Sequence, residues 1–118
     1  AATPTQLDDF TVIPKGARID SVEVITDTAA TSGGAAVLNV GIRELDATTA
    51  IDEDGFVAAL ALSSINVSGK RVALAVGSTS AGALIGTTLT KPGLLFADYD
   101  TAVYTAGAVR VRVNFYIP

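Results

Sequence analysis

The stretch Ala108–Ile117, with the sequence AVRVRVNFYI, constrains the fold more than any other part of the chain. Apolar and polar residues alternate along it, and the apolar ones are Val109, Val111, Val113, Phe115 and Ile117. Such alternation is typical of a half-buried β-strand with one face in the core and one in solvent. An apolar face of this length needs a second apolar surface to cover it, so the remaining chain should supply a facing sheet. We therefore expect this stretch to be a central core strand.

The rest of the chain contains further short alternating segments, separated by turns rich in Gly, Pro, Ser and Thr. With 118 residues, the chain is long enough for one domain with its own core. The predicted strands before the last one cover residues 10–13, 17–26, 36–42, 72–76, 84–90 and 94–99. Turns spaced about ten residues apart are typical of antiparallel sandwiches and barrels. We predict an all-β protein, an antiparallel, jelly-roll-like β-sandwich of seven to eight short strands, with residues 10–118 as a single domain.

Three local patterns add detail to this fold. The alternation between Ala17 and Thr26 changes parity near Ser21, which predicts a β-bulge there. The loop of small polar residues from Thr28 to Gly34 predicts an antiparallel hairpin between the strands on either side. For residues 56–62 the spacing fits two turns of helix after an acidic N-terminus, and a short strand fits nearly as well.

The N-terminal residues Ala1–Asp9 differ in character from the rest. They are small and polar and include Pro4, so they cannot bury enough apolar area to hold themselves in place. We interpret them as a flexible, extended arm that gains order on a partner. A frayed terminus without a role is the alternative.

The composition argues against an enzyme. There is no His, Cys, Met or Trp, so the usual general base near neutral pH and thiolate metal ligands are absent. Hydroxyls occur at Ser63, Ser64 and 78–80, but no His is present to activate them. The net charge of −4 and scattered basic residues disfavour nucleic-acid binding, and no unbroken apolar run is long enough to cross a membrane. We predict a non-enzymatic protein without a cofactor.

Two groups of side chains are candidate sites. The acids Asp52, Glu53 and Asp54 precede a Gly, as in loops that wrap Ca²⁺, but the spacing of an EF-hand is missing, which favours a solvated turn at the start of a helix over a metal site. Arg110 and Arg112 project from one face and can bind an acidic surface on a partner, or simply form the wet face of a sheet. The tyrosines at 99, 104 and 116 fit either a binding platform or packing between strands.

Several segments resemble the small virion proteins of tailed bacteriophages, of the capsid decoration or cement type. They are residues 12–19 (VIPKGARI) followed by Val-Glu-Val at 22–24, the alternating strand 36–41, the acid-Gly-Phe stretch 52–56 and the closing strand 107–113. The similarity runs in matching order from Phe10 to Phe115 and is weakest between Ser78 and Asp100.

The resemblance implies a structural protein of the virion, located on the capsid surface. It would bind the outside of the shell, bridge subunits of the major capsid protein and stabilise the shell, with self-association into a homo-oligomer left open. We expect the N-terminal arm and one loop end of the sandwich to carry the attachment. The candidate contact residues are Thr3, Pro4, Thr5, Gln6 and Leu7 of the arm, together with Arg110 and Arg112. The alternatives are a tail or head-fibre module and a glycan-binding adhesin.

Overall fold

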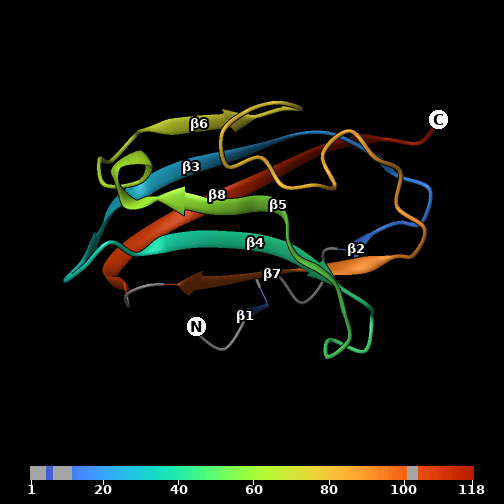
Figure 1. The fold of residues 1–118 in the computed structure, drawn as a ribbon, viewed down its shortest axis with the longest axis horizontal. Helices are drawn as coiled ribbons and strands as arrows, with labels where there is room; N and C mark the ends of the chain where they lie inside the picture. The colour runs from blue at the N-terminus through green and yellow to red at the C-terminus, as the bar shows by residue number, and fades with distance from the viewer. Residues whose placement is uncertain (1–4, 7–11, 101–103) are drawn as a thin grey trace.

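The computed structural model describes residues 5–6, 12–100 and 104–118 (Figure 1). In these residues the chain forms eight strands and one 3₁₀ helix. They are β1 (Thr5–Gln6), β2 (Val12–Ile13), β3 (Arg18–Ser32), β4 (Val37–Arg43), β5 (Ala50–Ala61), η1 (Leu62–Ser64), β6 (Arg71–Leu74), β7 (Gly93–Asp100) and β8 (Tyr104–Tyr116). The all-β prediction is therefore confirmed.

The strands form two antiparallel sheets. Sheet A has the order β1-β7-β4-β5, with β2 also paired to β7, and sheet B has the order β6-β3-β8. Both sheets contribute to one apolar core, whose largest fully buried side chains include Ile19 of sheet B and Ile42 and Phe56 of sheet A. The valine face of β8 packs against this core, as its alternation predicts.

The bulge predicted in β3 is present. The pairing of β3 with β8 shifts between Ile19 and Ser21, so Asp20 is the extra residue that restores the inward face. The predicted loop after residue 27 is wrong at its start, because β3 stays paired with β8 through Thr28 and Thr31 and ends only at Ser32. Pairing along a long partner strand overrides the weak strand propensity of this Ala- and Thr-rich stretch.

The predicted hairpin of β3 with β4 is wrong. β3 pairs with β6 and β8, whereas β4 pairs with β5 and β7 in the other sheet. Both strands bury apolar residues in the shared core, from opposite sides, and the short connection between them crosses from one sheet to the other. Neighbours in sequence therefore face each other across the core instead of lying side by side.

Residues 56–62 do not form a helix. They continue β5 up to Ala61, and only Leu62–Ser64 form a single 3₁₀ turn. The strand is irregular here, which accounts for the loss of a strict two-residue alternation. At Ala59 the backbone has φ of 53°, and its N–H donates a hydrogen bond to Oδ1 of the buried Asn39 at 2.9 Å. The strand alternative is the correct one.

The strand predicted at 84–90 is replaced by an irregular segment, residues 75–92, between β6 and β7 (Figure 1). Its backbone bonds to both sheets: Leu84 N–H donates to Gly55 O on β5 at 2.9 Å, and Leu89 N–H donates to Ala17 O just before β3 at 2.8 Å. This segment thus joins the β5 side of sheet A to the start of sheet B.

The final strand is an edge strand, so its predicted central position is wrong. In the described chain, β8 pairs with β3 alone, and its inward valines are only half-buried because nothing lies beyond them. The apolar residues at its end and just beyond it are more open still: Phe115 is 41% and Ile117, which follows β8, is 61% exposed.

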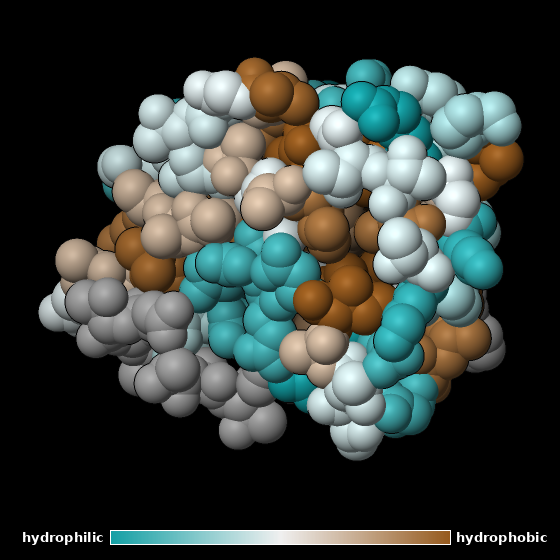
Figure 2. Space-filling view, turned by 45° about the vertical axis from the view of Figure 1, so that its right-hand side comes forward, coloured by the Kyte–Doolittle hydropathy of each residue, from teal (hydrophilic) through white to brown (hydrophobic). Residues whose placement is uncertain are grey.

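Other large apolar side chains that reach the surface are Val12, Leu45, Val67 and Val76. Figure 2 shows apolar residues on the face in view as clusters separated by polar ones. No helix among residues 5–6, 12–100 and 104–118 has the length and hydropathy to span a membrane.

Candidate functional site

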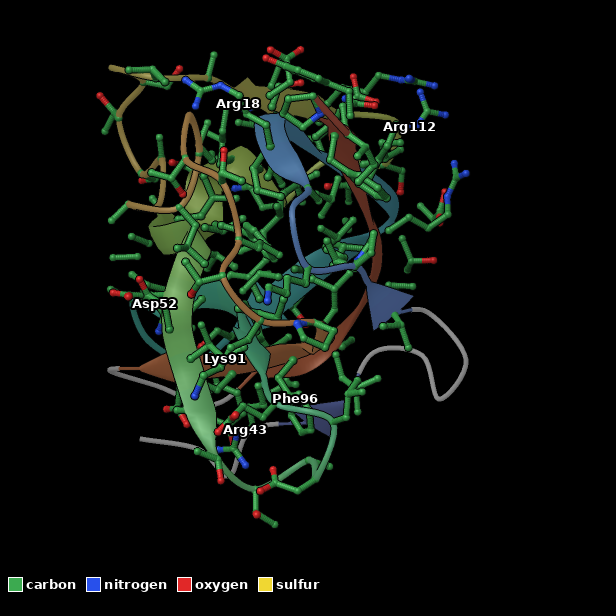
Figure 3. All side chains as sticks on the ribbon, turned by 90° about the vertical axis from the view of Figure 1, so that its right-hand side faces the viewer. Arg18, Arg43, Asp52, Lys91, Phe96 and Arg112 are labelled. Carbon is green, nitrogen blue, oxygen red and sulfur yellow. The ribbon has the colours of Figure 1, made fainter. Side chains whose placement is uncertain are left out.

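The outward face of sheet B concentrates basic side chains. Four of the eight Lys and Arg residues lie on its three strands, and they are Arg18, Arg71, Arg110 and Arg112. The strands of sheet A carry mainly acids instead, among them Asp52, Glu53 and Asp98. In Figure 3, Arg18 and Arg112 lie at the top, over sheet B, while Arg43 and Lys91 lie near the bottom. The strands of sheet B also carry the acids Asp20, Glu23 and Asp27, so they hold four basic and three acidic residues, against one basic and five acidic residues on the strands of sheet A. We call the outward face of sheet B, the less acidic side of the two sheets, the basic face.

The register of sheet B aligns the charges of this face. Glu23 on β3 lies directly opposite Arg112 on β8, and its Oε1 lies 3.4 Å from Arg71 Nη1 and 3.9 Å from Arg112 Nη1. The next outward residue of β3, Ile25, has Arg71 opposite on one side and Arg110 on the other. Ile25 is only 5% exposed, which fits coverage by the aliphatic stems of these arginines.

Arg110 and Arg112 differ in how strongly the protein already engages them. Arg110 Nε donates to Asp27 Oδ2 at 2.8 Å, and this hydrogen bond raises the pKa of Arg110. Among the described residues, Arg112 contacts an acid only at Glu23, at 3.9 Å, which is beyond hydrogen-bonding distance. Both side chains are 62% exposed, so these ion pairs are worth little and leave guanidinium donors open to a partner.

A surface pocket of about 290 Å³ lies beneath the first half of β8. It is lined by residues 104–109 of β8 together with Ala30, Leu38 and Ile65. The Tyr104 hydroxyl is buried there without a hydrogen-bond partner in the described part of the chain, and burial raises the pKa of Tyr104. Tyr104 and Tyr99 pack edge to face with centroids 5.8 Å apart, whereas Tyr116 lies at the far end of β8. The tyrosines therefore do not form one platform.

The acids Asp52, Glu53 and Asp54 lie within strand β5, not in a turn. Glu53 Oε1 pairs with Arg43 Nη2 at 2.6 Å, and the Arg43 guanidinium also lies 4.8 Å from the Phe96 ring centroid. Burial, followed by the neighbouring Asp54, raises the pKa of Asp52. Among the residues placed by the structure, no three His, Cys, Asp or Glu side chains are grouped as a metal site requires.

The tip of the β4–β5 connection is held by Asp46. Its Oδ1 accepts hydrogen bonds from the N–H groups of Thr48 and Thr49, both at 2.9 Å, and its Oδ2 accepts one from Thr49 Oγ1 at 2.6 Å. The Thr49 hydroxyl is the main cause that lowers the pKa of Asp46 from 3.8 to about 2. This loop stands beside the salt bridge of Lys91 with Glu44, away from the basic face.

We expect Thr49→Val to raise the pKa of Asp46 from about 2 toward 3.8, because it removes the strongest of these hydrogen bonds. A lowered carboxyl pKa stabilises the fold above the unfolded value of 3.8, and this contribution is lost as the pH falls toward 2. Titration of the Asp46 carboxyl carbon by NMR in both proteins measures the shift. An identical pKa in the two proteins contradicts the assignment.

The N-terminal candidates are only partly placed. Thr5 and Gln6 form β1, opposite Ala97 and Phe96 of β7, whereas Thr3, Pro4 and Leu7 lie outside the described residues. Arg110 and Arg112 lie on the far sheet from β1. Of the N-terminal candidates, the two that are placed, Thr5 and Gln6, therefore do not cluster with Arg110 and Arg112.

Sequence reasoning missed the contribution of Arg71 and Glu23 to the basic face. These residues join Arg112 only through the register of β3 with β6 and β8, and no spacing in the sequence reveals that register. Comparison with known proteins finds no matching family model, no similar curated protein and no similar solved structure.

Proposed function

We propose that this chain is a structural component of a bacteriophage virion that attaches to the outside of the capsid and stabilises the shell. In this proposal it bridges neighbouring subunits of the major capsid protein and carries out no catalysis. The two sheets act as a rigid, jelly-roll-like β-sandwich that holds the attachment surface in shape. The sequence resemblance supplies the class of partner.

The observation that carries the proposal is the basic face of sheet B. Its four arginines lie on three adjacent strands of a chain with net charge −4, and Arg110 and Arg112 are each 62% exposed. Arginine donates several hydrogen bonds in a fixed plane and can bind one carboxylate through two parallel hydrogen bonds. An acidic strip on the capsid, repeated over its lattice, is the complementary partner, and repetition multiplies weak contacts by avidity.

Co-sedimentation tests this proposal. Purified chain is mixed with shells assembled from the major capsid protein of the same phage, and pelleted protein is measured against free protein at increasing salt. We expect saturable binding that weakens with salt, as exposed ion pairs do, and shells that resist heat longer when occupied. No pelleting at low salt contradicts the proposal.

Deleting residues 1–9 is a less clean test of attachment. It removes the proposed arm, but it also removes β1 from the edge of β7 and so disturbs sheet A. Substitutions on the basic face avoid this ambiguity because their side chains lie in solvent.

A further inference from the structure

The outer edge of β8 is the longest strand edge left open in the described chain. β8 is 13 residues long and pairs with β3 on one side only. The corresponding edge of β7 is paired with β1 and β2, and the edge of β5 bonds to residues 80–84, as in the Ala58 N–H to Ser80 O bond of 2.9 Å. Strand β6, at the other side of sheet B, is only four residues long.

This edge has the properties of a pairing surface. Residues 108–116 of β8 run without a bulge of their own, since the two extra residues along this part of the ladder, Asp20 and Asp27, belong to β3. No Pro interrupts them, and their two charged side chains point outward, away from the core. Natural proteins block open edges with prolines, bulges, inward charges and charged side chains on the edge strand, and of these only the two outward arginines are present on this stretch.

We propose that the open edge of β8 pairs with β8 of a second copy of this chain, antiparallel, about a twofold axis at Val113. The two copies of sheet B then form one continuous sheet of six strands. A strand added in this way completes the backbone hydrogen bonds that β8 leaves open, and the paired side chains set the register.

The residue pattern of β8 is self-complementary about Val113. With the axis there, residues at equal distance on either side lie opposite each other and on the same face. The resulting pairs are Val113 with itself, Val111 with Phe115, Val109 with Ile117, Arg112 with Asn114, and Arg110 with Tyr116. Every inward pair is apolar, and every outward pair places an arginine opposite an uncharged polar side chain.

Other symmetric registers that keep the valines inward fit less well. An axis at residue 110, 111 or 112 places arginine directly opposite arginine, which destabilises a strand pair. An axis at Asn114 separates the arginines but places Pro118, which has no N–H to donate, opposite Arg110. Only the axis at Val113 pairs the whole stretch 109–117 without opposing like charges.

The pairing also explains the exposed apolar residues at the end of β8. Phe115 and Ile117, 41% and 61% exposed, are covered by Val111 and Val109 of the other copy. Tyr116, 50% exposed, comes to lie beside the guanidinium of Arg110, an arrangement favoured by the attraction of a cation to an aromatic ring. The inference goes beyond attachment to a shell and does not depend on it, because a dimer forms in solution without the capsid.

The absence of cysteine from the chain allows a direct test by disulfide trapping. In the proposed register, the two Val113 residues lie opposite each other with Cα atoms about 4.5 to 5.5 Å apart, within the range that a disulfide spans. Val111→Cys is the matched control. Its two copies are offset by four residues, about 13 Å along the strands, which no disulfide spans.

Three purified variants are oxidised at high concentration and run on a non-reducing gel: Val113→Cys, Val111→Cys and Asn114→Cys. The mass of the unmodified chain in solution is measured by sedimentation equilibrium. We expect Val113→Cys to form a linked dimer, the other two variants to stay mainly unlinked, and the unmodified chain to approach twice its mass of 11.9 kDa as concentration rises. Circular dichroism confirms that each variant is folded. Preferential linkage through Val111→Cys or Asn114→Cys overturns the register, and a chain that stays monomeric with no linkage in folded Val113→Cys overturns the dimer. Failure of shell binding leaves this result unaffected.

Discussion

Replacing Gly41 with Ala is expected to lower the free energy of unfolding by about 3 kcal/mol, because overpacking a tight backbone contact forces the structure to shift. A Cβ added at Gly41 meets the backbone of Asp52 and Glu53 on the neighbouring strand β5. The pairing of β4 with β5 is irregular at this point: Val40 lies opposite Val57 and Ile42 opposite Asp52, so several β5 residues bulge over Gly41. Only a residue without a side chain lets β5 pass so closely.

The matched control is Gly33→Ala, in the connection between β3 and β4. A Cβ at Gly33 meets nothing within 4 Å. Alanine there restricts the unfolded chain, so we expect no loss and a gain of up to about 1 kcal/mol. Urea denaturation of both variants measures the difference. Equal stability of the two variants contradicts the tight passage of β5 over Gly41.

Replacing Arg110 and Arg112 together with Ser is expected to weaken attachment to the shell about 100-fold, since each removed charge-assisted hydrogen bond contributes about 1.5 kcal/mol. The fold should lose little stability, because the exposed ion pair of Arg110 with Asp27 contributes about 0 to 1 kcal/mol and the shorter side chain uncovers only part of Ile25. Of the two single variants, Arg112→Ser should have the larger effect on attachment, since Arg112 has no hydrogen bond to Glu23 to give up.

Lys91→Ser is the control for this experiment. Lys91 is similarly exposed, at 61%, and its Nζ lies 3.1 Å from Glu44 Oε1, but it is away from the basic face (Figure 3). Its removal changes the net charge without changing sheet B. Co-sedimentation at fixed salt measures all four proteins against the unmodified chain. If the double variant still attaches as well as the unmodified chain, Arg110 and Arg112 do not contact the capsid and belong to an ordinary solvated sheet face.

The sequence predicted those features of the fold that are determined within a single strand, such as its inward face or a bulge. Alternation in Ala108–Ile117 identified the inward valines, and the change of parity near Ser21 identified the bulge at Asp20, because both follow from the two-residue period of a strand. The alternating segments and the turns about ten residues apart were enough to predict an all-β chain.

Pairing between strands could not be predicted in the same way. Alternation shows which face of a strand is buried, but it does not show which strand lies beside it, so β3 and β4 read as a hairpin although they belong to different sheets. For the same reason, β8 read as a central strand, and its open edge became visible only with the sheet order. The basic face depends on register across β6, β3 and β8 and was therefore only half identified, through Arg110 and Arg112.

The central claim is that sheet B is the side of this protein that meets the capsid. A cryo-electron microscopy reconstruction of the native particle tests it most directly, with the two sheets fitted into density on the outer surface of the shell. We expect the density of this chain to lie outside the shell, with Arg110 and Arg112 of β8 facing acidic residues of the major capsid protein. Density that places sheet A against the shell and turns the basic face toward solvent contradicts the claim.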